Sequence, residues 1–374
     1  MQVLLTIFKF FAHGGAQRDM LMAAEALKRR NCQVTILCSR ADDPVPEGLQ
    51  LKVLPVKGLS NHSRARDFER QAARYIKEHK FDVVVGFSRM SNLDILFAAD
   101  DCLRARWKNP LLNMLLPRRK TFLEQEQAAL KSPLILTLTG RQEFDYKFFY
   151  NIEPEKFKRL PPGISEKYRS FDRSDAARHA IRQRLEVAPE KFLIVQAAAS
   201  FKTKGVDRTL AVISMLPDEL KKRIVFIAAG GDKRRKNYEA AARVQNIDAR
   251  FPGSSDTLEE LFFAADLMVH PARSESAGNV LIEALCCNLP VLTGKRCGFA
   301  EYLTSSGSGV VLPEKFNPEH YITALKMLMT EPEHLQKCRS NAGNLYKSDF
   351  WYSRAEVIAD EIINFARTKE STES

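Results

Sequence analysis

The chain has 374 residues, of which 45% are hydrophobic and 28% are charged, and its formal net charge is +11. This length exceeds one ordinary domain and predicts two packed cores, while no apolar run reaches the ~20 residues that a membrane-spanning helix needs. The basic balance instead indicates an anionic partner: nucleic acid, a membrane surface or a phosphorylated small molecule.

Neither the cysteines nor the N-terminus indicates secretion. The seven cysteines show no Cys-x-x-Cys spacing, which argues against a disulfide framework or zinc site and for reduced thiols in a cytoplasmic protein. Met1–Phe8 lacks a positively charged start and is followed by Lys9, so it predicts a first strand rather than a signal peptide.

Apolar and amphipathic segments alternate through the first half of the chain, which predicts strands alternating with helices. The predicted strands are Val3–Phe8, Gln33–Ser39, Leu51–Pro55, Val83–Phe87 and Leu134–Leu138. The predicted helices are Ala16–Arg30, Ser63–His79 and Thr139–Phe149. The polar stretch Ser165–Arg178 is interpreted as a linker.

The alternation then restarts. The second half predicts strands at Phe192–Ala198, Ile224–Ala229, Leu267–His270 and Val291–Thr293. Its predicted helices are Val206–Leu216, Arg235–Val244, Leu258–Ala264 and Gly278–Cys287, and Asn317-Pro318 begins a largely helical region.

This order predicts two Rossmann-like, doubly wound α/β domains that face a cleft, with ligands bound beyond the carboxyl ends of the strands. The expected limits are 1–165 for the N-terminal domain and 166–345 for the C-terminal domain. We expect residues 346–374 to form a C-terminal helix that packs back on the N-terminal domain, then a polar tail near Lys369.

Glycine-containing loops follow several predicted strands. His13-Gly14-Gly15 opens the first predicted helix, and paired glycines there let a ligand approach the backbone and the helix N-terminus. Lys204-Gly205 begins a second helix, where a lysine suits a diphosphate, although a solvated helix start is the alternative. Two further loops contain Gly230-Gly231 and Gly253-Ser254, and in a parallel sheet they lie on one edge.

The segment from Glu275 to Glu283 is the most informative motif. Glu275 falls on a strand-to-helix loop and Glu283 lies inside the following helix, so both can reach one crevice. Backbone N–H groups there suit a diphosphate, and the two carboxylates suit the hydroxyls of a sugar and of a ribose. A surface glutamate and a helix glutamate at chance spacing is the alternative.

Together these motifs resemble the GT-B glycosyltransferases, specifically the retaining family 4 group with its E-x7-E signature. Other segments resemble the lipopolysaccharide core glucosyltransferases, which add glucose to inner-core heptose. They are Phe11-x-x-Gly14-Gly15-x-Gln17-Arg18-Asp19, Asn61-His62-x-Arg64, Gly86-Phe87, Leu93-Asp94, Phe97-Ala98-Ala99-Asp100, Leu160-Pro161-Pro162-Gly163-Ile164, Lys204-Gly205-Val206-Asp207-Arg208 and Ala264-Ala265-Asp266-Leu267.

The resemblance implies a donor site. Gly14, Gly15 and Asp19 would contact the transferred sugar and diphosphate. Lys204 would bind the diphosphate, Glu275 the sugar hydroxyls and Glu283 the ribose. The remaining expected donor residues are Lys202, Gly230, Ser254, Ser276, Ala277, Gly278 and Asn279. In two places the chain departs from the family, with Thr203 where Arg usually precedes the lysine and Ser254 where the relatives are often basic.

The resemblance also implies the reaction, in which glucose passes from UDP-glucose to a heptose of the lipopolysaccharide inner core with retained configuration. No Asp-x-Asp motif occurs, so we expect no metal and no cofactor, with Lys204 and helix dipoles stabilising the leaving diphosphate. Asp100, Glu275 and Lys204 are the expected catalytic residues, and Asp100 could instead cap a turn.

An insertion about residues 103–131 interrupts the alternation in the N-terminal, acceptor-side domain. Its cations are interleaved with aliphatic residues, a combination typical of membrane-surface segments, although an ordinary helical insertion is the alternative. The expected membrane residues are Arg104, Arg106, Trp107, Lys108, Arg118, Arg119 and Lys120. The expected location is cytoplasmic, peripheral on the inner face of the cytoplasmic membrane of a Gram-negative-type bacterium.

Asn61, His62 and Arg64 are expected on the acceptor side, where a basic neighbour suits a phosphorylated or carboxylated sugar; helix capping is the alternative for His62. The expected partners are a nucleotide-sugar donor, a lipid-linked saccharide acceptor and an anionic membrane surface. Nucleic acid is not expected, because the basic run contains one aromatic residue rather than a set of stacking platforms. Another UDP-hexose donor, another cell-surface glycan acceptor or a sugar-nucleotide epimerase remain alternatives.

Overall fold

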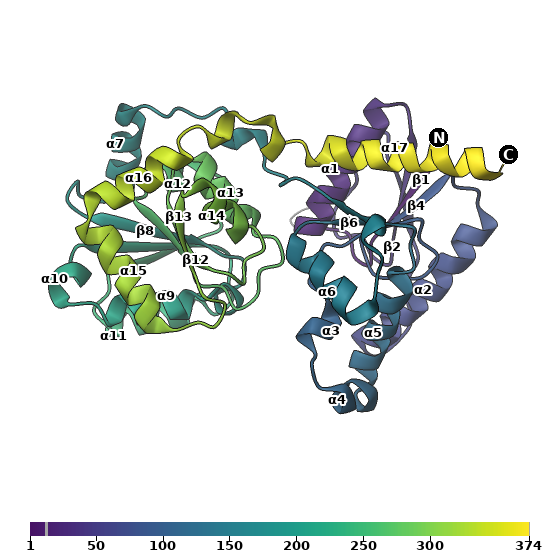
Figure 1. Cartoon of the computed structure of the whole chain (residues 1–374), viewed down its shortest axis with the longest axis horizontal. Coiled ribbons are helices and arrows are strands. Elements are labelled where there is room, and N and C mark those ends of the chain that lie inside the picture. The colour runs from purple at the N-terminus through teal and green to yellow at the C-terminus, as the bar shows by residue number, and fades with distance from the viewer. Residues whose placement is uncertain (12–13, 374) are drawn as a thin grey trace. The chain divides into compact units, whose positions relative to one another are not determined.

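The computed structural model describes residues 1–11 and 14–373 and divides the chain into two compact units (Figure 1). The first unit holds Met1–Gly163 and the residues from Ser353 onward, and the second holds Ile164–Tyr352. His13 of the expected glycine turn lies outside the described residues. The expected start of a separate C-terminal segment at 346 is wrong, because residues 346–352 remain within the second unit.

A seven-stranded parallel sheet in the order β3-β2-β1-β4-β5-β6-β7 forms the centre of the first unit. The apolar runs of β1 and β4 are buried, as expected for central strands covered on both faces, whereas edge strand β3 is largely exposed. The strands are β1 (Gln2–Thr6), β2 (Gln33–Cys38), β3 (Gln50–Val53), β4 (Val83–Gly86), β5 (Ile95–Phe97), β6 (Leu134–Thr137) and β7 (Phe157–Arg159). The short β5 and β7 were not predicted.

The helices of the first unit cover this sheet and include the C-terminal helix, which packs along α1 (Figure 1). They are α1 (Gly15–Arg29), α2 (Asn61–Glu78), α3 (Leu103–Arg106), α4 (Pro110–Leu115), α5 (Pro117–Ala129), α6 (Gly140–Tyr150) and α17 (Arg354–Glu373). Ser60 and Thr139 begin α2 and α6 with reciprocal capping boxes. The expected polar tail near Lys369 is wrong, because α17 continues past it and Lys369 forms an ion pair with Asp94 at 3.0 Å.

The second unit contains a six-stranded parallel sheet in the order β10-β9-β8-β11-β12-β13. Its strands are β8 (Phe192–Ala197), β9 (Ile224–Ala229), β10 (Ala249–Gly253), β11 (Leu267–His270), β12 (Val291–Gly294) and β13 (Gly309–Leu312). The sequence predicted four of them and did not predict β10 or β13, which lie at the two edges of the sheet.

Around this second sheet, the helices near residues 206–214, 235–244, 258–264, 279–286 and from 318 onward lie where the sequence predicted them, whereas four others, at 175–184, 201–204, 218–221 and 300–306, were not predicted. The α-helices of this unit are α7 (Asp175–Arg184), α8 (Phe201–Lys204), α9 (Val206–Ser214), α10 (Asp218–Lys221), α11 (Arg235–Val244), α12 (Leu258–Ala264), α13 (Asn279–Cys286), α14 (Ala300–Ser306), α15 (Pro318–Thr330) and α16 (Pro332–Ala342). The interpretation of Ser165–Arg178 as a linker is wrong. Tyr168 is buried in the core of this unit, and α7 begins at Asp175.

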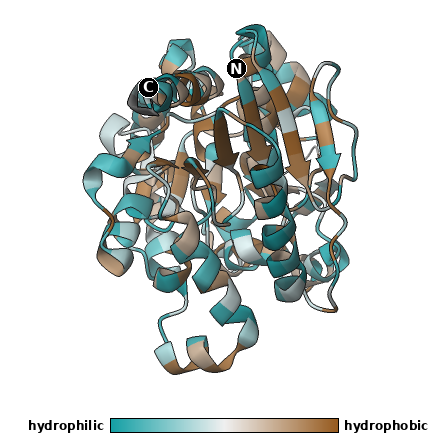
Figure 2. Cartoon of the chain, turned by 90° about the vertical axis from the view of Figure 1, so that its right-hand side faces the viewer, coloured by the Kyte–Doolittle hydropathy of each residue, from teal (hydrophilic) through white to brown (hydrophobic). Residues whose placement is uncertain are grey.

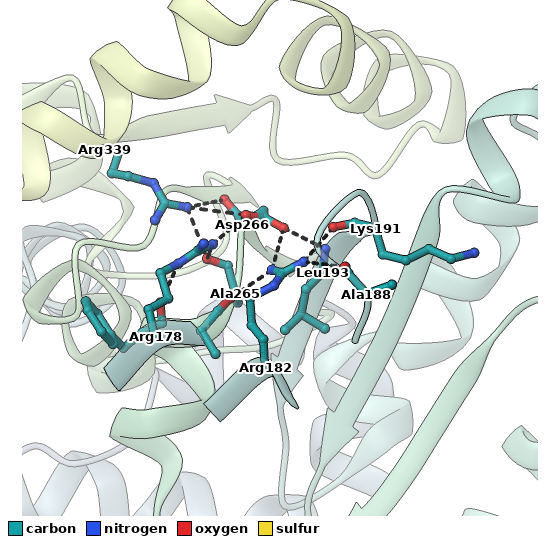
Figure 3. A network of polar contacts seen from close by, with 10 residues as sticks. Arg178, Arg182, Ala188, Lys191, Leu193, Ala265, Asp266 and Arg339 are labelled. Carbon is teal, nitrogen blue, oxygen red and sulfur yellow. Dashed lines mark hydrogen bonds and ion pairs between the residues drawn. The ribbon is translucent and has the colours of Figure 1, made fainter. Parts of the chain in front are cut away.

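A polar network closes the amino ends of β8 and β11 (Figure 3). Asp266 directly precedes β11 and accepts from Arg178 and Arg182, at 2.7 and 3.1 Å, and from the Leu193 backbone N–H at 2.8 Å. Arg339 of α16 donates to the Ala265 carbonyl at 3.0 Å. This end of the sheet is therefore occupied by internal contacts.

The opposite, carboxyl ends of the strands hold the loops. In each sheet the strand order reverses next to the first strand, between β1 and β4 and between β8 and β11, where open α/β sheets bind ligands. Figure 2 shows that strands inside the sheets are mostly hydrophobic, while hydrophilic and hydrophobic residues alternate along the helices. Within the described part of the chain, no helix combines the length and apolar character needed to cross a bilayer.

Candidate active site

Glu275 and Lys204 form an ion pair beyond the carboxyl ends of β8 and β11. Lys204 ends α8, after β8, and its Nζ lies 2.5 Å from Oε2 of Glu275, which follows β11. Both side chains are mostly buried, with 23% and 14% of their surface exposed. The two loops that flank the switch point thus bring together two residues that the sequence assigned to one site.

A second donor reaches the same carboxylate oxygen. His270, the last residue of β11, is fully buried, and its Nε2 lies 3.2 Å from Oε2 of Glu275. Burial opposes a charge on His270, but the interactions with Cys297 and Glu275 outweigh it and raise the pKa of His270 to about 9. The site therefore holds one carboxylate between two cations at neutral pH.

The pKa of Glu275 moves in the opposite direction. Burial would raise it, but the hydrogen bond from His270 and the charges of Lys204 and His270 outweigh burial and lower the pKa to about 2. Glu275 is consequently ionised throughout the physiological range and is available as an acceptor for hydroxyl groups.

Glycine makes the close approach of the two loops possible. Gly205 follows Lys204 with φ +81°, and an added Cβ would lie 2.3 Å from the Pro271 carbonyl oxygen. Gly278 precedes α13 with φ +93°, and an added Cβ would lie 3.2 Å from Cγ of Glu275. Any side chain at Gly205 would therefore push the Lys204 loop away from the Glu275 loop.

Thr203 stands where the family usually has Arg, and another arginine, Arg273, lies close to this loop. Arg273 donates to both carboxylate oxygens of Asp207, at 2.7 and 2.8 Å, and to the Lys202 carbonyl at 2.7 Å. Lys202 itself forms an ion pair with Asp207 at 3.0 Å rather than with Glu275. Lys202 and Lys204 thus have separate carboxylate partners.

Two of the expected donor residues have a clear structural explanation. An added Cβ at Gly230 would lie 1.8 Å from the Ala198 carbonyl oxygen, so glycine is needed where β8 and β9 end. Ser254 is exposed beyond β10, and its hydroxyl lies near Gly231. Ser254 also lines a cavity of about 410 Å³ with Phe251 and Pro252.

Glu283 lies inside α13 and is 8% exposed. Its Oε2 accepts a hydrogen bond from the Tyr168 hydroxyl at 3.3 Å. Ser276, Ala277, Gly278 and Asn279 form the loop and first turn between Glu275 and Glu283, as the motif predicts. Tyr168 was missed, because it falls in the stretch that we interpreted as a linker.

The first unit presents its own helix N-terminus. Gly14 is the N-cap of α1, and an added Cβ at Gly15 would meet no atom of the described residues within 4 Å. Asp19 is 4% exposed, and its Oδ2 accepts from Nη1 of Arg354 at 3.0 Å. Arg354 is fully buried at the start of α17 and had no sequence signal.

A cavity of about 400 Å³ lies in the first unit at the carboxyl ends of β1, β4 and β5. Its walls combine aromatic and polar side chains, including Phe8, Phe68, Phe87, Asn61, Arg89 and Asp100. Asp100 is 77% exposed, and its Oδ2 lies 3.6 Å from Nη1 of Arg89. Arg89 also forms an ion pair with the buried Glu126 at 3.0 Å. The sequence found Asn61 and Asp100 but neither Arg89 nor Glu126.

His62 and Arg64 support the start of α2 instead. The Ser60 hydroxyl lies 3.0 Å from a ring nitrogen of His62, and Arg64 donates to the Gly58 carbonyl at 2.8 Å. The structure therefore places Asn61 at the cavity, while the other two predicted acceptor-side residues have local partners outside its lining.

The insertion contains three short helices, with α4 farthest from the sheet (Figure 1). Five of its apolar side chains are exposed by 42–75%: Leu111, Leu112, Met114, Leu115 and Leu116. Arg119 lies over the Trp107 ring and Arg104 over the Tyr150 ring, at 5.5 and 5.6 Å from their centroids. Of the other expected membrane residues, Arg106, Lys108, Arg118 and Lys120 are exposed.

Glu126 fixes the insertion to the cavity wall. Its carboxylate accepts from the Leu103 backbone N–H at 2.8 Å, at the start of α3, and from the Tyr150 hydroxyl at 2.7 Å. Among residues 1–11 and 14–373 no group of three His, Cys, Asp or Glu side chains is arranged to hold a metal ion.

Comparison with known proteins decides the family. A model of glycosyltransferase family 4 matches residues 13–168, and a model of glycosyl transferases group 1 matches residues 177–345. The chain is 33% identical to the lipopolysaccharide glucosyltransferase WaaG of Escherichia coli (strain K12), over 97% of this chain and 98% of that protein. The chain belongs to the WaaG family of glycosyltransferases.

Solved structures agree with this assignment. The crystal structure of WaaG superposes with a TM-score of 0.86 at 32% identity, covering 96% of this chain and 99% of that one. The two parallel-sheet units are thus those of the GT-B fold, as predicted. Anabaena Alr3699/HepE, solved in complex with UDP-glucose, shares the fold with a TM-score of 0.72 at 15% identity, covering 99% of this chain and 100% of that one.

More distant relatives share the activity class. The chain is 28% identical to the D-inositol 3-phosphate glycosyltransferase of Streptomyces bingchenggensis (strain BCW-1), over 63% of this chain and 54% of that protein. The WaaG family assignment and both family models make this chain a glycosyltransferase.

Proposed function

We propose that this glycosyltransferase transfers glucose from UDP-glucose to a heptose of the lipopolysaccharide inner core, with retention and without a metal ion. The name of its 33% identical relative, a lipopolysaccharide glucosyltransferase, supports the donor hexose and the pathway. The observation that carries the donor chemistry is the Lys204–Glu275 pair beyond β8 and β11, where this fold binds ligands.

The pair suits a nucleotide sugar because its two charges recognise different parts of the donor. The Lys204 ammonium has three N–H donors and can bind a diphosphate oxygen while keeping Glu275. As the bond from the anomeric carbon to the diphosphate breaks, charge grows on the leaving oxygen, and the ammonium stabilises it. Glu275 would hold sugar hydroxyls as positive charge develops at the anomeric carbon.

The acceptor would use the cavity of the first unit. A sugar ring needs an apolar wall for its C–H face and polar groups for its hydroxyls, and the lining includes Phe87 as well as Asn61 and Arg89. The new bond forms between the acceptor oxygen and the anomeric carbon, and the hydroxyl proton leaves. Asp100 at this cavity would accept that proton or stabilise positive charge at the sugar carbon.

The insertion would dock on an anionic membrane surface, and the enzyme would then lie at the inner face of the cytoplasmic membrane, within reach of a lipid-linked acceptor. Exposed aliphatic residues on α4 would enter the acyl boundary, and the flanking cations would meet anionic headgroups at about 1 kcal/mol each. Replacing Arg104, Arg106, Lys108, Arg118, Arg119 and Lys120 by Gln should weaken sedimentation with anionic vesicles and spare transfer to a soluble acceptor fragment.

A matched control replaces the exposed Lys233, Arg234 and Lys236 of the second unit, which should leave vesicle binding unchanged. Unchanged binding by the six-residue variant would refute docking through the insertion.

The decisive test incubates the enzyme with a panel of UDP- and GDP-sugars and truncated-core lipopolysaccharide. We expect product only with UDP-glucose and acceptor together, and the same rate with a metal chelator. Transfer from another UDP-hexose, or to another cell-surface glycan, would replace the donor or acceptor in the proposal. Conversion of the donor without acceptor would instead indicate an epimerase.

A further inference from the structure

The hydrogen bonds of Glu275 are distributed unevenly between its two oxygens. Lys204 and His270 both bind Oε2, and no described residue donates to Oε1. A carboxylate with two donors on one oxygen keeps the other available for a ligand. The positions of Lys204 and His270, which both bind Oε2, therefore determine where Oε1 points.

Lys204 alone cannot fix this orientation. Its ammonium is a point charge on a flexible four-carbon chain, whereas the imidazole of His270 is a rigid ring. The ring is fully buried at the end of β11, and the His270 carbonyl accepts from Oγ1 of Thr293 on the neighbouring strand at 2.8 Å. Nε2 of His270 is thus a donor whose direction is set by the sheet.

We propose that His270 is a positioning residue for the donor sugar: its Nε2–H, together with Lys204, holds Oε2 of Glu275 and so directs Oε1 toward the sugar hydroxyls. This inference rests on the proposed nucleotide-sugar donor. A buried histidine at the end of β11 thus has a role in binding the donor sugar. When the diphosphate engages Lys204, His270 remains to hold Glu275 in place.

The surroundings of His270 favour its protonated form. The ionisable groups that act on the ring are Glu275 on the following loop and Cys297 beyond β12, and Lys204 of α8 contacts the same Glu275 oxygen as the ring. Together Cys297 and Glu275 raise the pKa of His270 to about 9 in spite of its burial. Protonation makes the bond to Glu275 charge-assisted and therefore stronger.

Two substitutions of His270 carry the same amide group at different distances from Glu275, so they test whether the position of the donor matters. In His270→Gln the side-chain amide can reach the place of Nε2, while in His270→Asn it stops near Nδ1, too short for Glu275. We expect His270→Asn to weaken UDP-glucose binding about tenfold and to leave UDP binding within about twofold. The Gln variant should lose clearly less affinity for UDP-glucose than the Asn variant.

A second readout is selectivity. The wild-type enzyme should prefer UDP-glucose to analogues that lack one sugar hydroxyl, and His270→Asn should lose that preference for at least one analogue. A merely structural histidine would lower the melting temperature and affect UDP and UDP-glucose equally, which would overturn the proposal.

The pH dependence of binding covers the case in which the Asn variant does not fold. The affinity of the wild-type enzyme for UDP-glucose should fall as the pH rises through about 9, where His270 loses its charge. The variant His270→Gln keeps Lys204 but has no imidazole, so its affinity should not show that decline. Identical pH profiles of the two enzymes would overturn the proposal.

Two outcomes distinguish failure of the proposed function from failure of this inference. If the wild-type enzyme binds UDP and UDP-glucose equally and transfers no sugar, the proposed function itself fails. If Glu275→Gln no longer binds UDP-glucose but His270→Asn still does, only the role of His270 fails.

Discussion

Two carboxylates at opposite ends of β11 show how similar ion clusters serve different purposes. Asp266 precedes the strand and Glu275 follows it, and their side chains are 18% and 14% exposed. Each lies among cations. Asp266, however, uses both oxygens for Arg178, Arg182 and a backbone N–H (Figure 3), whereas the donors of Glu275 share one oxygen.

The cations differ as well. Arg178 and Arg182 also donate to the carbonyls of Phe263 and Ala264, at the end of α12, so they cannot leave Asp266 without exposing other polar groups. Lys204 has a flexible side chain that is 23% exposed, so it can exchange or share its partner when an anion arrives. The structural cluster is therefore the one around Asp266, in which both carboxylate oxygens accept hydrogen bonds. The functional cluster is the one around Glu275, in which one oxygen remains available to a ligand.

Replacing Glu275 by Gln should produce the largest effect on catalysis. The amide keeps the shape but removes the negative charge that faces the developing positive charge of the sugar. We expect kcat to fall by about 10³-fold and the melting temperature to fall as well, because the variant lacks the charge that pairs with Lys204 and His270. Steady-state kinetics and thermal unfolding of one preparation measure both. Retained turnover would remove Glu275 from the catalytic residues.

Asp100 extends the comparison to the first unit. Its carboxylate is 77% exposed and has one long contact to Arg89, so by the same criterion it is open to a ligand. Asp100→Asn should lower transfer at least ~100-fold with little change in donor affinity or melting temperature. The neighbouring Asp101→Asn is the matched control and should remain close to wild type. Activity within a few-fold in a folded Asp100→Asn enzyme would place Asp100 among the supporting residues.

Asp266→Asn should lower stability and leave turnover unchanged, in contrast to the substitutions of Glu275 and Asp100. Removing the charge leaves Arg178 and Arg182 without their common carboxylate, at a cost of about 3 kcal/mol in the free energy of unfolding. Turnover of the folded enzyme at 25 °C should be unchanged. The exposed Asp218, which pairs with Lys221 in the next turn, is the control, and Asp218→Asn should cost less than about 1 kcal/mol. A catalytic defect without loss of stability would invalidate the distinction.

The sequence predicted the features whose signal is local. Buried strands are short apolar runs, and the strand–glycine–helix pattern located Lys204 and Glu275 because each loop directly follows its strand. The same argument explains the missed strands: β5 and β7 have three residues each, and β10 begins with Ala249-Arg250 at a sheet edge, so none contains a long apolar run.

The residues that support the site depend on contacts between distant segments, and a single sequence does not contain that information. Tyr168 and Glu283 are 115 positions apart, and Asp19 and Arg354 are 335 positions apart. Tyr168 lies in a polar stretch typical of linkers, and only its burial shows its part in the second core. His270 had a visible position at the strand end, but its two-donor arrangement with Lys204 requires the folded geometry.

The pH dependence of stability gives the smallest and most selective test of the comparison. His270 has a folded pKa of about 9, above its ordinary value of 6.5. Its bond to Glu275 therefore contributes stability that is fully present below about pH 6.5 and is lost as the pH rises through 9. We expect the second unit to lose about 3 kcal/mol over that range in the wild-type enzyme and much less in His270→Gln. Asp266→Asn should retain the wild-type pH dependence, because the cluster around Asp266 contains only arginine cations, which keep their protons in this range. Equal slopes for the wild type and His270→Gln would mean that the charge on His270 does not stabilise the fold, and the contrast between the two clusters would then rest on the open oxygen of Glu275 alone.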